Sequence, residues 1–351
     1  MCQDRYRLVR FSRILLVVGL PLFLAGCGNL SYISHLGWRQ GYITYYSVPV
    51  PEILEQESTD GTVKEKIRFI QEVKSFGEEK LGLSKTGSYS KFFKNEGPVL
   101  HAVTACPKDR LQPHTWKFPI TGEVPYKGFF SREGALKEKR SLDEKGFDTL
   151  VQGTAAYSTL GWLKDPIFSS MLEWDDTTLA NVILHEMTHA TVYFKGETEL
   201  NEQLATFIGN RAVIEFLKEK HGSGSIEVTR ALHAQEDDLL FSRWIDQACG
   251  QMSLFYSQDI SREEKLRGRE KVFRSIKDDF REMKVQFKTD LYPDLEGVEL
   301  NNAVLLAYRR YFHQLERFEA IYNHLGQDLR KFVEHFKEIQ VSGKKATLAL
   351  R

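Results

Sequence analysis

Two histidines four residues apart, with a glutamate directly after the first, stand out in this chain of 351 residues. They lie in NVILHEMTHATVYFKGETELNEQLATF (181–207) as His185 and His189, and the glutamate is Glu186. Residues four apart lie on one face of a helix, so the two imidazoles can bind one metal ion. Glu186 projects about 100° away from His185 and can act on a water molecule without binding the metal. The spacing predicts a hydrolytic metal site.

A hydrolytic zinc site needs a third protein ligand and a fourth position for water. One known arrangement places a third histidine six residues after the second, but Lys195 occupies that position here. The other arrangement takes a glutamate from the next helix, and a glycine-containing break after Lys195 separates two helical stretches. In the second stretch, Asn-Glu-Gln-Leu-Ala (201–205) favours Glu202 as the third ligand. Glu197 and Glu199 remain alternatives.

Hydrolysis of an amide also needs a donor for the negative oxygen that develops at the scissile carbonyl. Tyrosine hydroxyls are suitable donors, and three tyrosines are candidates. We favour Tyr157, which lies in AYSTLGW just before the ligand helix, and Tyr311, which lies in a later helix. Tyr193 is a third candidate. For each tyrosine, packing in the core is the competing interpretation.

Two further roles have more than one candidate. Ligating histidines need acceptors for their second ring nitrogen, and Asn181, Asp175 or Asp176 could supply them. A site that binds the free N-terminus of a peptide would also need a carboxylate for the α-ammonium group. Glu197 and Glu199 could serve, although a solvated turn is the simpler interpretation.

The first residues predict an exported protein. A basic segment, a short apolar run at 14–24 and small residues precede Cys27. This order is typical of a secretory signal, and the run is too short for the ~20 residues of a membrane span. Leu-Ala-Gly-Cys at 24–27 resembles a bacterial lipobox, which implies cleavage before Cys27 and a lipid on its sulfur. Gly28 after the cysteine implies transfer to the outer membrane. We therefore expect a signal peptide at 1–26 and a protein that faces the periplasm.

Charge and cysteine content narrow the class of protein. The chain carries 48 basic and 48 acidic residues, and residues 1–26 hold four Arg and one Asp, so their removal leaves a net charge of about −3. Nucleic-acid binders carry a basic surface, so we expect no nucleic-acid partner. Cys106 and Cys249 remain after the signal and the lipobox. An oxidising compartment permits a disulfide between them, but two buried free thiols are an equal alternative.

The hydrophobic pattern predicts an α+β fold, in which a small mixed N-terminal lobe with short strands precedes a mainly helical lobe that carries the metal site. We expect a lipid tether and irregular lead-in at 27–62 and a metallopeptidase domain at 63–351. Within this domain, the mixed lobe covers 63–175 and the helical lobe covers 176–351. Helices are expected at 64–81, 131–145, 301–325 and 328–339, another after the capping-box pattern at 261–264, strands at 99–105 and 147–151, and a hairpin from 116–120 and 124–130.

Several blocks of the sequence resemble one protein family. They are GSYSKFF (87–93), HTWKFPITGEVPYKGFF (114–130), AYSTLGWLKDPIFSSML (156–172), LHEMTHATVYFKGETELNEQLATF (184–207) and LNNAVL (300–305). In these blocks the chain resembles the bacterial predicted-aminopeptidase lipoproteins, over nearly all of its length after the signal. The resemblance implies a zinc peptidase of the gluzincin type, in which His185, His189 and Glu202 bind one Zn²⁺ and Glu186 is the general base.

One position departs from that family. Its members often have cysteines on both sides of the first hairpin turn, where this chain has Lys117 and Glu123. A disulfide across this turn is therefore impossible here. The departure does not involve the expected metal ligands.

We therefore expect a lipid-anchored zinc metallopeptidase that hydrolyses peptide bonds, and the resemblance implies an aminopeptidase. One alternative is an envelope endopeptidase with the same metal site. Another is a non-catalytic zinc-binding lipoprotein that binds an envelope partner, although a structural site would not need Glu186. The expected partners are a peptide substrate and the membrane, which the protein reaches through the lipid on Cys27.

Overall fold

A computed structural model describes residues 27–118, 122–154, 156–161, 163–292, 295 and 297–343. The expected signal peptide at 1–26 lies outside the described residues, as does the side chain of Cys27. The chain divides into a first unit that ends at Tyr46 and a second unit that begins at Ser47. Within the described residues, we find no helix with the length and apolar character of a membrane span.

The elements follow one another in the order of an α+β protein, which confirms the predicted fold class. The helices are α2 (Cys27–Tyr46), α3 (Val50–Glu55), α4 (Gly61–Glu79), α5 (Arg132–Glu144), α6 (Asp176–His189), α7 (Thr198–His221), α8 (Ile226–Tyr256), α9 (Arg262–Lys284), α10 (Asn302–Phe312), α11 (Leu315–His324) and α12 (Leu329–Val341), with a 3₁₀ helix, η2 (Ser169–Glu173). The strands are β1 (Val48–Pro49), β2 (Lys91–Phe93), β3 (Leu100–Pro107), β4 (Trp116–Phe118), β5 (Gly122–Val124), β6 (Lys127–Phe129), β7 (Phe147–Thr154) and β8 (Ile167–Phe168).

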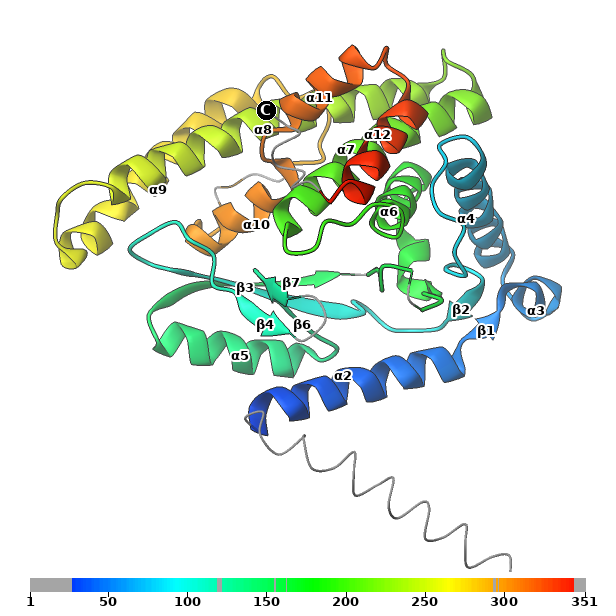
Figure 1. The fold of residues 1–351 in the computed structure, drawn as a ribbon, viewed down its shortest axis with the longest axis horizontal. Helices are drawn as coiled ribbons and strands as arrows, with labels where there is room; N and C mark the ends of the chain where they lie inside the picture. The colour runs from blue at the N-terminus through cyan, green and yellow to red at the C-terminus, as the bar shows by residue number, and fades with distance from the viewer. Residues whose placement is uncertain are drawn as a thin grey trace, which may run out of the picture. The chain divides into compact units, whose positions relative to one another are not determined.

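The two longest strands, β3 and β7, form an antiparallel sheet with the short β6, in the order β6–β3–β7. Helix α5 packs on one face of this sheet and α10 on the other (Figure 1). Val103 and Ala105 of β3 meet Ala135 and Leu142 of α5 in a buried apolar cluster. The sheet is thus covered on both faces, and α10 connects it to the helical half of the chain.

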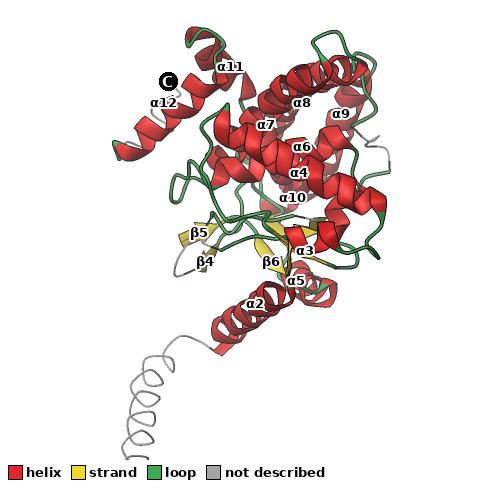
Figure 2. Cartoon of the chain, turned by 90° about the vertical axis from the view of Figure 1, so that its right-hand side faces the viewer, coloured by secondary structure: helices red, strands yellow, loops and turns green. Residues whose placement is uncertain are grey.

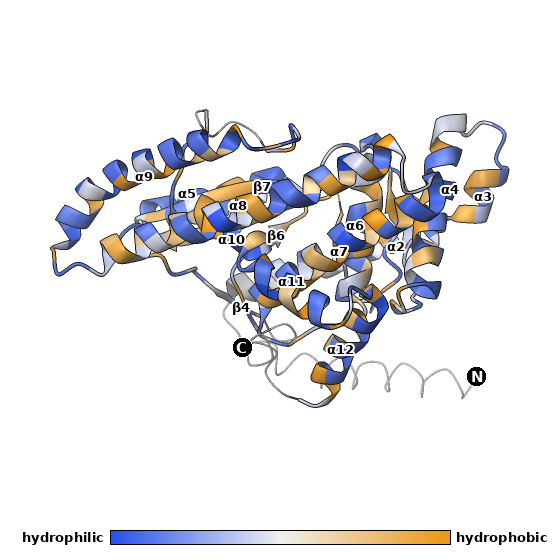
Figure 3. Ribbon diagram, turned by 90° about the horizontal axis from the view of Figure 1, so that it is seen from above, coloured by the Kyte–Doolittle hydropathy of each residue, from blue (hydrophilic) through white to orange (hydrophobic). Residues whose placement is uncertain are grey.

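Helix α7 is the centre of the helical half, and most of its residues between Leu200 and Leu217 are buried. It packs against α6, α8 and α10, and these four helices lie on one side of the strands (Figure 2). Apolar residues recur among hydrophilic ones along α9 (Figure 3), and Phe273, Ile276 and Phe280 join the core shared with α8. This single apolar stripe packs the otherwise polar helix α9 against α8.

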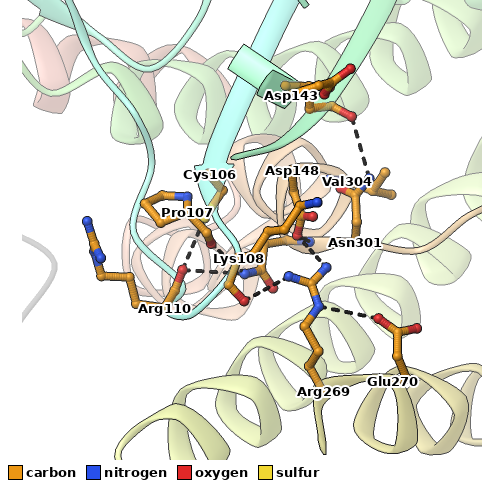
Figure 4. A network of polar contacts seen from close by, with 12 residues as sticks. Cys106, Pro107, Lys108, Arg110, Asp143, Asp148, Arg269, Glu270, Asn301 and Val304 are labelled. Atoms are coloured by element: carbon orange, nitrogen blue, oxygen red, sulfur yellow. Dashed lines mark hydrogen bonds and ion pairs between the residues drawn. The ribbon is translucent and has the colours of Figure 1, made fainter. Parts of the chain in front are cut away.

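A buried polar network joins α9 and α10 to the sheet (Figure 4). Arg269 of α9 donates to Asp148 of β7 at 2.6 Å and to the carbonyl of Lys108 at 2.8 Å. The same carboxylate of Asp148 accepts from the backbone N–H of Asn302, the first residue of α10, at 3.0 Å. Asp148 therefore fixes two helices to one strand.

Most of the predicted elements are present with ends shifted by a few residues. The capping box of Ser261 and Glu264 opens α9 as predicted. The predicted helix over 301–325 is wrong as a single element, because it breaks between α10 and α11. At the break, Gln314 has φ 55° and its backbone N–H donates to Asp246 of α8 at 3.1 Å. A tertiary hydrogen bond thus ends a helix that local preference would continue.

Two other expectations need correction. The irregular lead-in expected at 27–62 contains α2 and α3. The second strand of the predicted hairpin is split in two. Its first part, β5, pairs with β4, whereas its second part, β6, pairs with β3 in the larger sheet. Pro125, which has no backbone N–H to donate, lies between β5 and β6.

The two positions at which the family that this chain resembles often has cysteines are adjacent in space. Lys117 and Glu123 are directly opposite each other in the β4–β5 pair, and an ion pair of 2.9 Å joins their side chains.

The two cysteines that follow Cys27 in this chain, Cys106 and Cys249, are both free and buried. The alternative of two buried free thiols therefore describes this structure.

Candidate metal centre

Helix α6 carries both histidines of the motif on one face. It begins after Asp175, whose carboxylate accepts from the backbone N–H of Thr178 at 3.0 Å, a regular N-cap. His185 and His189 lie one turn apart near its C-terminal end, and their ring centroids are 4.8 Å apart. His189 is 8% exposed. The local sequence therefore presents two imidazoles towards the same buried point.

Glu202 of α7 completes the cluster. Its Oε2 lies 3.3 Å from Nε2 of His185 and 3.4 Å from Nε2 of His189. Close packing of the two helices permits this approach, because Gly209 of α7, which has no side chain, lies against Asn181 and His185 of α6. A Cβ at Gly209 would meet the carbonyl oxygen of Asn181 at 3.2 Å.

The loop between the two ligand helices is anchored by Asn201. Its side-chain amide donates to the carbonyl of Phe194 and accepts from the N–H of the same residue, both at 2.8 Å. Asn201 is buried, so these hydrogen bonds are shielded from water. The Asn of the sequence pattern thus positions the neighbouring Glu202 instead of binding the metal itself.

The alternative third ligands lie elsewhere. Glu199 forms an ion pair with Arg309 of α10, with Oε2 3.8 Å from Nη2. Glu197 is the residue before the first turn of α7. Within the described part of the chain, the only group of three or more potential metal ligands is His185, His189 and Glu202.

The donor set fits a zinc ion. One ligand atom from each of the three residues lies within 4.8 Å of the others, and two imidazoles with one carboxylate form a known catalytic zinc set. Burial raises the pKa of Glu202, but the adjacent imidazoles of His189 and His185 outweigh it and hold the pKa well below the usual value. Burial lowers the pKa of His189, but Glu202 outweighs it, so the net shift is upward. The carboxylate of Glu202 thus stays ionised and favours a positive charge beside it.

Glu186 lines the same cavity as the three ligands. Burial raises the pKa of its carboxyl group, and the nearby imidazoles of His189 and His185 only partly offset this. A second carboxylate, Asp165, is 4% exposed, and its Oδ1 has no hydrogen-bond partner. Burial raises the pKa of Asp165 to about 6. The pKa of Glu186 therefore lies above its usual value, as suits a general base.

All three candidate tyrosines line this cavity. The ring centroid of Tyr311 is 6.3 Å from that of His185. Glu202, followed by burial, raises the pKa of Tyr311, so its hydroxyl keeps its proton. Tyr157 packs against Phe168 with a centroid distance of 5.5 Å. Both Tyr157 and Tyr311 therefore reach the site, and Tyr311 lies beside a ligand.

The expected acceptors for the histidines have other partners. The side chain of Asn181 donates to Asn210 of α7 at 2.7 Å. Asp175 caps α6, and Asp176 forms an ion pair of 2.8 Å with Lys66. Nδ1 of His189 is buried without a hydrogen-bond partner. The sequence therefore predicted residues of the ligand helix and its N-cap, but not the contacts that their side chains make.

The cavity around the cluster has a volume of about 790 Å³, within the range of ligand pockets. Four polar residues that the sequence reasoning missed also line it: Tyr126, Asn210, Asp238 and Arg310. They come from the β5–β6 connection and from α7, α8 and α10. Of these four, only Arg310 could have been found from the sequence, because it is a charged residue on the same helix face as the apolar Ala303 and Leu306.

Comparison with known proteins gives one match. A model of the family described as "Putative aminopeptidase" matches residues 31–349 of this chain. The curated proteins and the solved structures yield no match. The matched range includes the whole second unit up to the end of α12, and with it every residue of the candidate metal centre.

Proposed function

The chain belongs to the family described as putative aminopeptidases, and we propose that it is a zinc-dependent aminopeptidase. The observation that carries the proposal is the meeting of His185, His189 and Glu202 within one cavity that Glu186 also lines. Family membership supports a peptidase, and the donor set supports zinc. The cavity volume of about 790 Å³ suits the end of a peptide rather than a folded protein.

Each residue has a role in this proposal. Zn²⁺ held by the three ligands would polarise the scissile carbonyl and acidify a water molecule. Glu186 accepts a proton from that water and delivers it to the leaving amine. Tyr311, beside His185, donates a hydrogen bond to the developing oxyanion. Tyr157 is the alternative donor.

The test compares the full chain with Glu186→Gln, an isosteric change that removes the base. Both are loaded with zinc and assayed on peptides with free and with blocked N-termini. We expect cleavage of free-N-terminus peptides only, with kcat lowered at least about a hundredfold in Glu186→Gln and zinc content unchanged. Glu263→Gln, at an exposed position of α9, is the matched control and should retain activity.

Each other outcome selects a different function. Cleavage of blocked peptides would identify an endopeptidase with the same metal site. Zinc bound at one equivalent with no cleavage of either set would favour the zinc-binding lipoprotein. A purified protein that binds no metal would remove the basis of the proposal.

We also propose that a lipid on Cys27 anchors the protein in the outer membrane, facing the periplasm. The lipobox-like sequence supports this, as do exposed aromatic side chains on α2, where Trp38 is 64% and Tyr45 is 81% exposed. Aromatic residues of this kind are typical of membrane–water interfaces. Labelling cells with a radioactive fatty acid should mark the wild-type protein and not Cys27→Ser. An unlabelled wild-type protein would contradict the anchor.

A further inference from the structure

Two arginines in the described chain are almost fully buried, and they differ in their partners. Arg269 and Arg310 are 5% and 4% exposed. Arg269 forms an ion pair with Asp148 at 2.6 Å (Figure 4). Arg310 forms no ion pair with any described residue. Because an isolated buried charge costs several kcal/mol unless it is paired, Arg310 is the unusual one.

The contacts of Arg310 hold its guanidinium in place without neutralising it. Nη2 donates to Oγ1 of Thr104 at 3.1 Å and to the carbonyl of Pro125 at 3.4 Å. The guanidinium carbon lies 4.8 Å from the ring centroid of Tyr126. Nε is buried and has no hydrogen-bond partner. Neutral groups, which include the hydroxyl of Tyr311, therefore hold the guanidinium, and its Nε keeps an unused N–H to donate.

This unpaired cation is part of the wall of the metal cavity. Arg310 and Tyr126 both line it, together with Tyr311, the next residue of α10. Burial raises the pKa of Tyr126, as does the negative charge of Glu202, whereas the positive charge of Arg310 lowers it. An anion that pairs with Arg310 would therefore lie in the cavity, beside Tyr126.

We propose that Arg310 binds the free α-carboxylate of a short peptide substrate, and that this contact selects di- and tripeptides. The proposal rests on the proposed peptidase function and deepens it. A guanidinium and a carboxylate form two parallel charge-assisted hydrogen bonds, the strongest such contact available in a protein. An extended peptide gains about 3.5 Å per residue. In a di- or tripeptide cleaved after its first residue, one or two residues therefore span about 3.5 to 7 Å from the scissile bond to the α-carboxylate.

The discriminating substrates are tripeptides with a free N-terminus, each made as the C-terminal acid and as the C-terminal amide. We expect the zinc-loaded full chain to favour the acid by about ten- to a hundredfold in kcat/KM, mainly through KM. Arg310→Gln should reduce this ratio to about one, chiefly through a rise in KM for the acid. Arg309→Gln removes the same charge from the neighbouring position, which does not line the cavity, and should retain the ratio.

Several results would overturn the carboxylate subsite. Equal kcat/KM for acid and amide in the wild-type protein would do so directly. An equal loss on both substrates in Arg310→Gln would show that Arg310 acts through Tyr311, as a positioning residue for the oxyanion donor. If Arg310→Gln does not fold, Arg310→Lys retains the charge without the planar geometry, and we expect it to keep part of the preference.

The failure of the peptidase proposal can be separated from the failure of this one. If the wild-type protein cleaves no peptide, calorimetric titration of the zinc-loaded chain with the same acid and amide still measures the subsite. Tighter binding of the acid by tenfold or more, lost in Arg310→Gln, would support the carboxylate subsite without catalysis. Equal binding of the two forms would overturn it.

Discussion

The side chain of Asn201 and the backbone of Phe194 exchange two hydrogen bonds of 2.8 Å, which close the loop between the two ligand helices. Since this loop joins His189 to Glu202, the pair determines how the third ligand meets the histidines. Ligand-positioning contacts of this kind contribute strongly to metal affinity.

We expect Asn201→Ala to lower the zinc affinity about ten- to a hundredfold and the free energy of unfolding by about 2–4 kcal/mol, because two buried backbone groups lose their partners. Competition with a chromogenic chelator measures the first effect and urea unfolding the second. Asn323→Ala, on the exposed side of α11, should change neither. Unaltered zinc affinity in Asn201→Ala would show that the loop does not position Glu202.

Metal removal should destabilise the folded protein. A ligand that binds only the folded state adds about 3–4 kcal/mol when its concentration is 100 to 1,000 times Kd. We therefore expect a chelator to lower the melting temperature of the wild-type chain by several degrees, with recovery on adding zinc. His189→Ala should melt at one temperature with or without zinc, whereas Glu186→Gln should respond as the wild type does. A chelator response that persists in His189→Ala would place the bound metal elsewhere.

The core of this site was predictable because its parts are close in sequence. His185 and Glu202 are 17 residues apart. The helical periodicity on both sides of one glycine-containing break is therefore almost enough to predict that the three ligands meet. The same holds for the capping box of α9, which depends on contacts within four residues. Local patterns determine local structure.

The rest of the cavity depends on tertiary packing and could not be derived this way. Arg310 and Tyr126 meet because α10 lies on the sheet next to the β5–β6 connection, and they are far apart in the sequence. Asp238 reaches Asn210 from a different helix. The break at Gln314 likewise depends on a carboxylate of α8. No single segment contains the information for these contacts.

Asp238 predicts a pH dependence of stability. Burial raises the pKa of its carboxyl group from 3.8 to about 7. Above pH 4 the unfolded chain loses this proton more readily than the folded one, so ionisation progressively destabilises the folded state as the pH rises to about 7. Asp238→Asn lacks this effect.

We expect Asp238→Asn to become more stable relative to the wild type between pH 4 and pH 8, by about 1–3 kcal/mol. The upper limit is less than the full shift because Asp238 lines the solvent-accessible cavity. Urea unfolding at a series of pH values measures the difference. Asp278→Asn, an exposed position on α9, controls for loss of a carboxylate. A difference that is constant with pH would mean that Asp238 is ionised normally in the folded protein.

The buried pair of Arg269 and Asp148 predicts a large and asymmetric mutational effect. Asp148→Ala leaves the guanidinium of Arg269 buried without its carboxylate and removes the acceptor for the backbone of Asn302. We expect a loss of about 3–5 kcal/mol in the free energy of unfolding. Urea unfolding of the single variants and of Asp148→Leu/Arg269→Met should show the double variant to be more stable than Asp148→Ala, because it leaves no buried unpaired charge.

The control is Lys117→Ala, which removes the solvent-exposed ion pair with Glu123 and should leave the unfolding midpoint unchanged. If Asp148→Ala unfolds at the wild-type midpoint, the network in Figure 4 does not join α9 and α10 to the sheet.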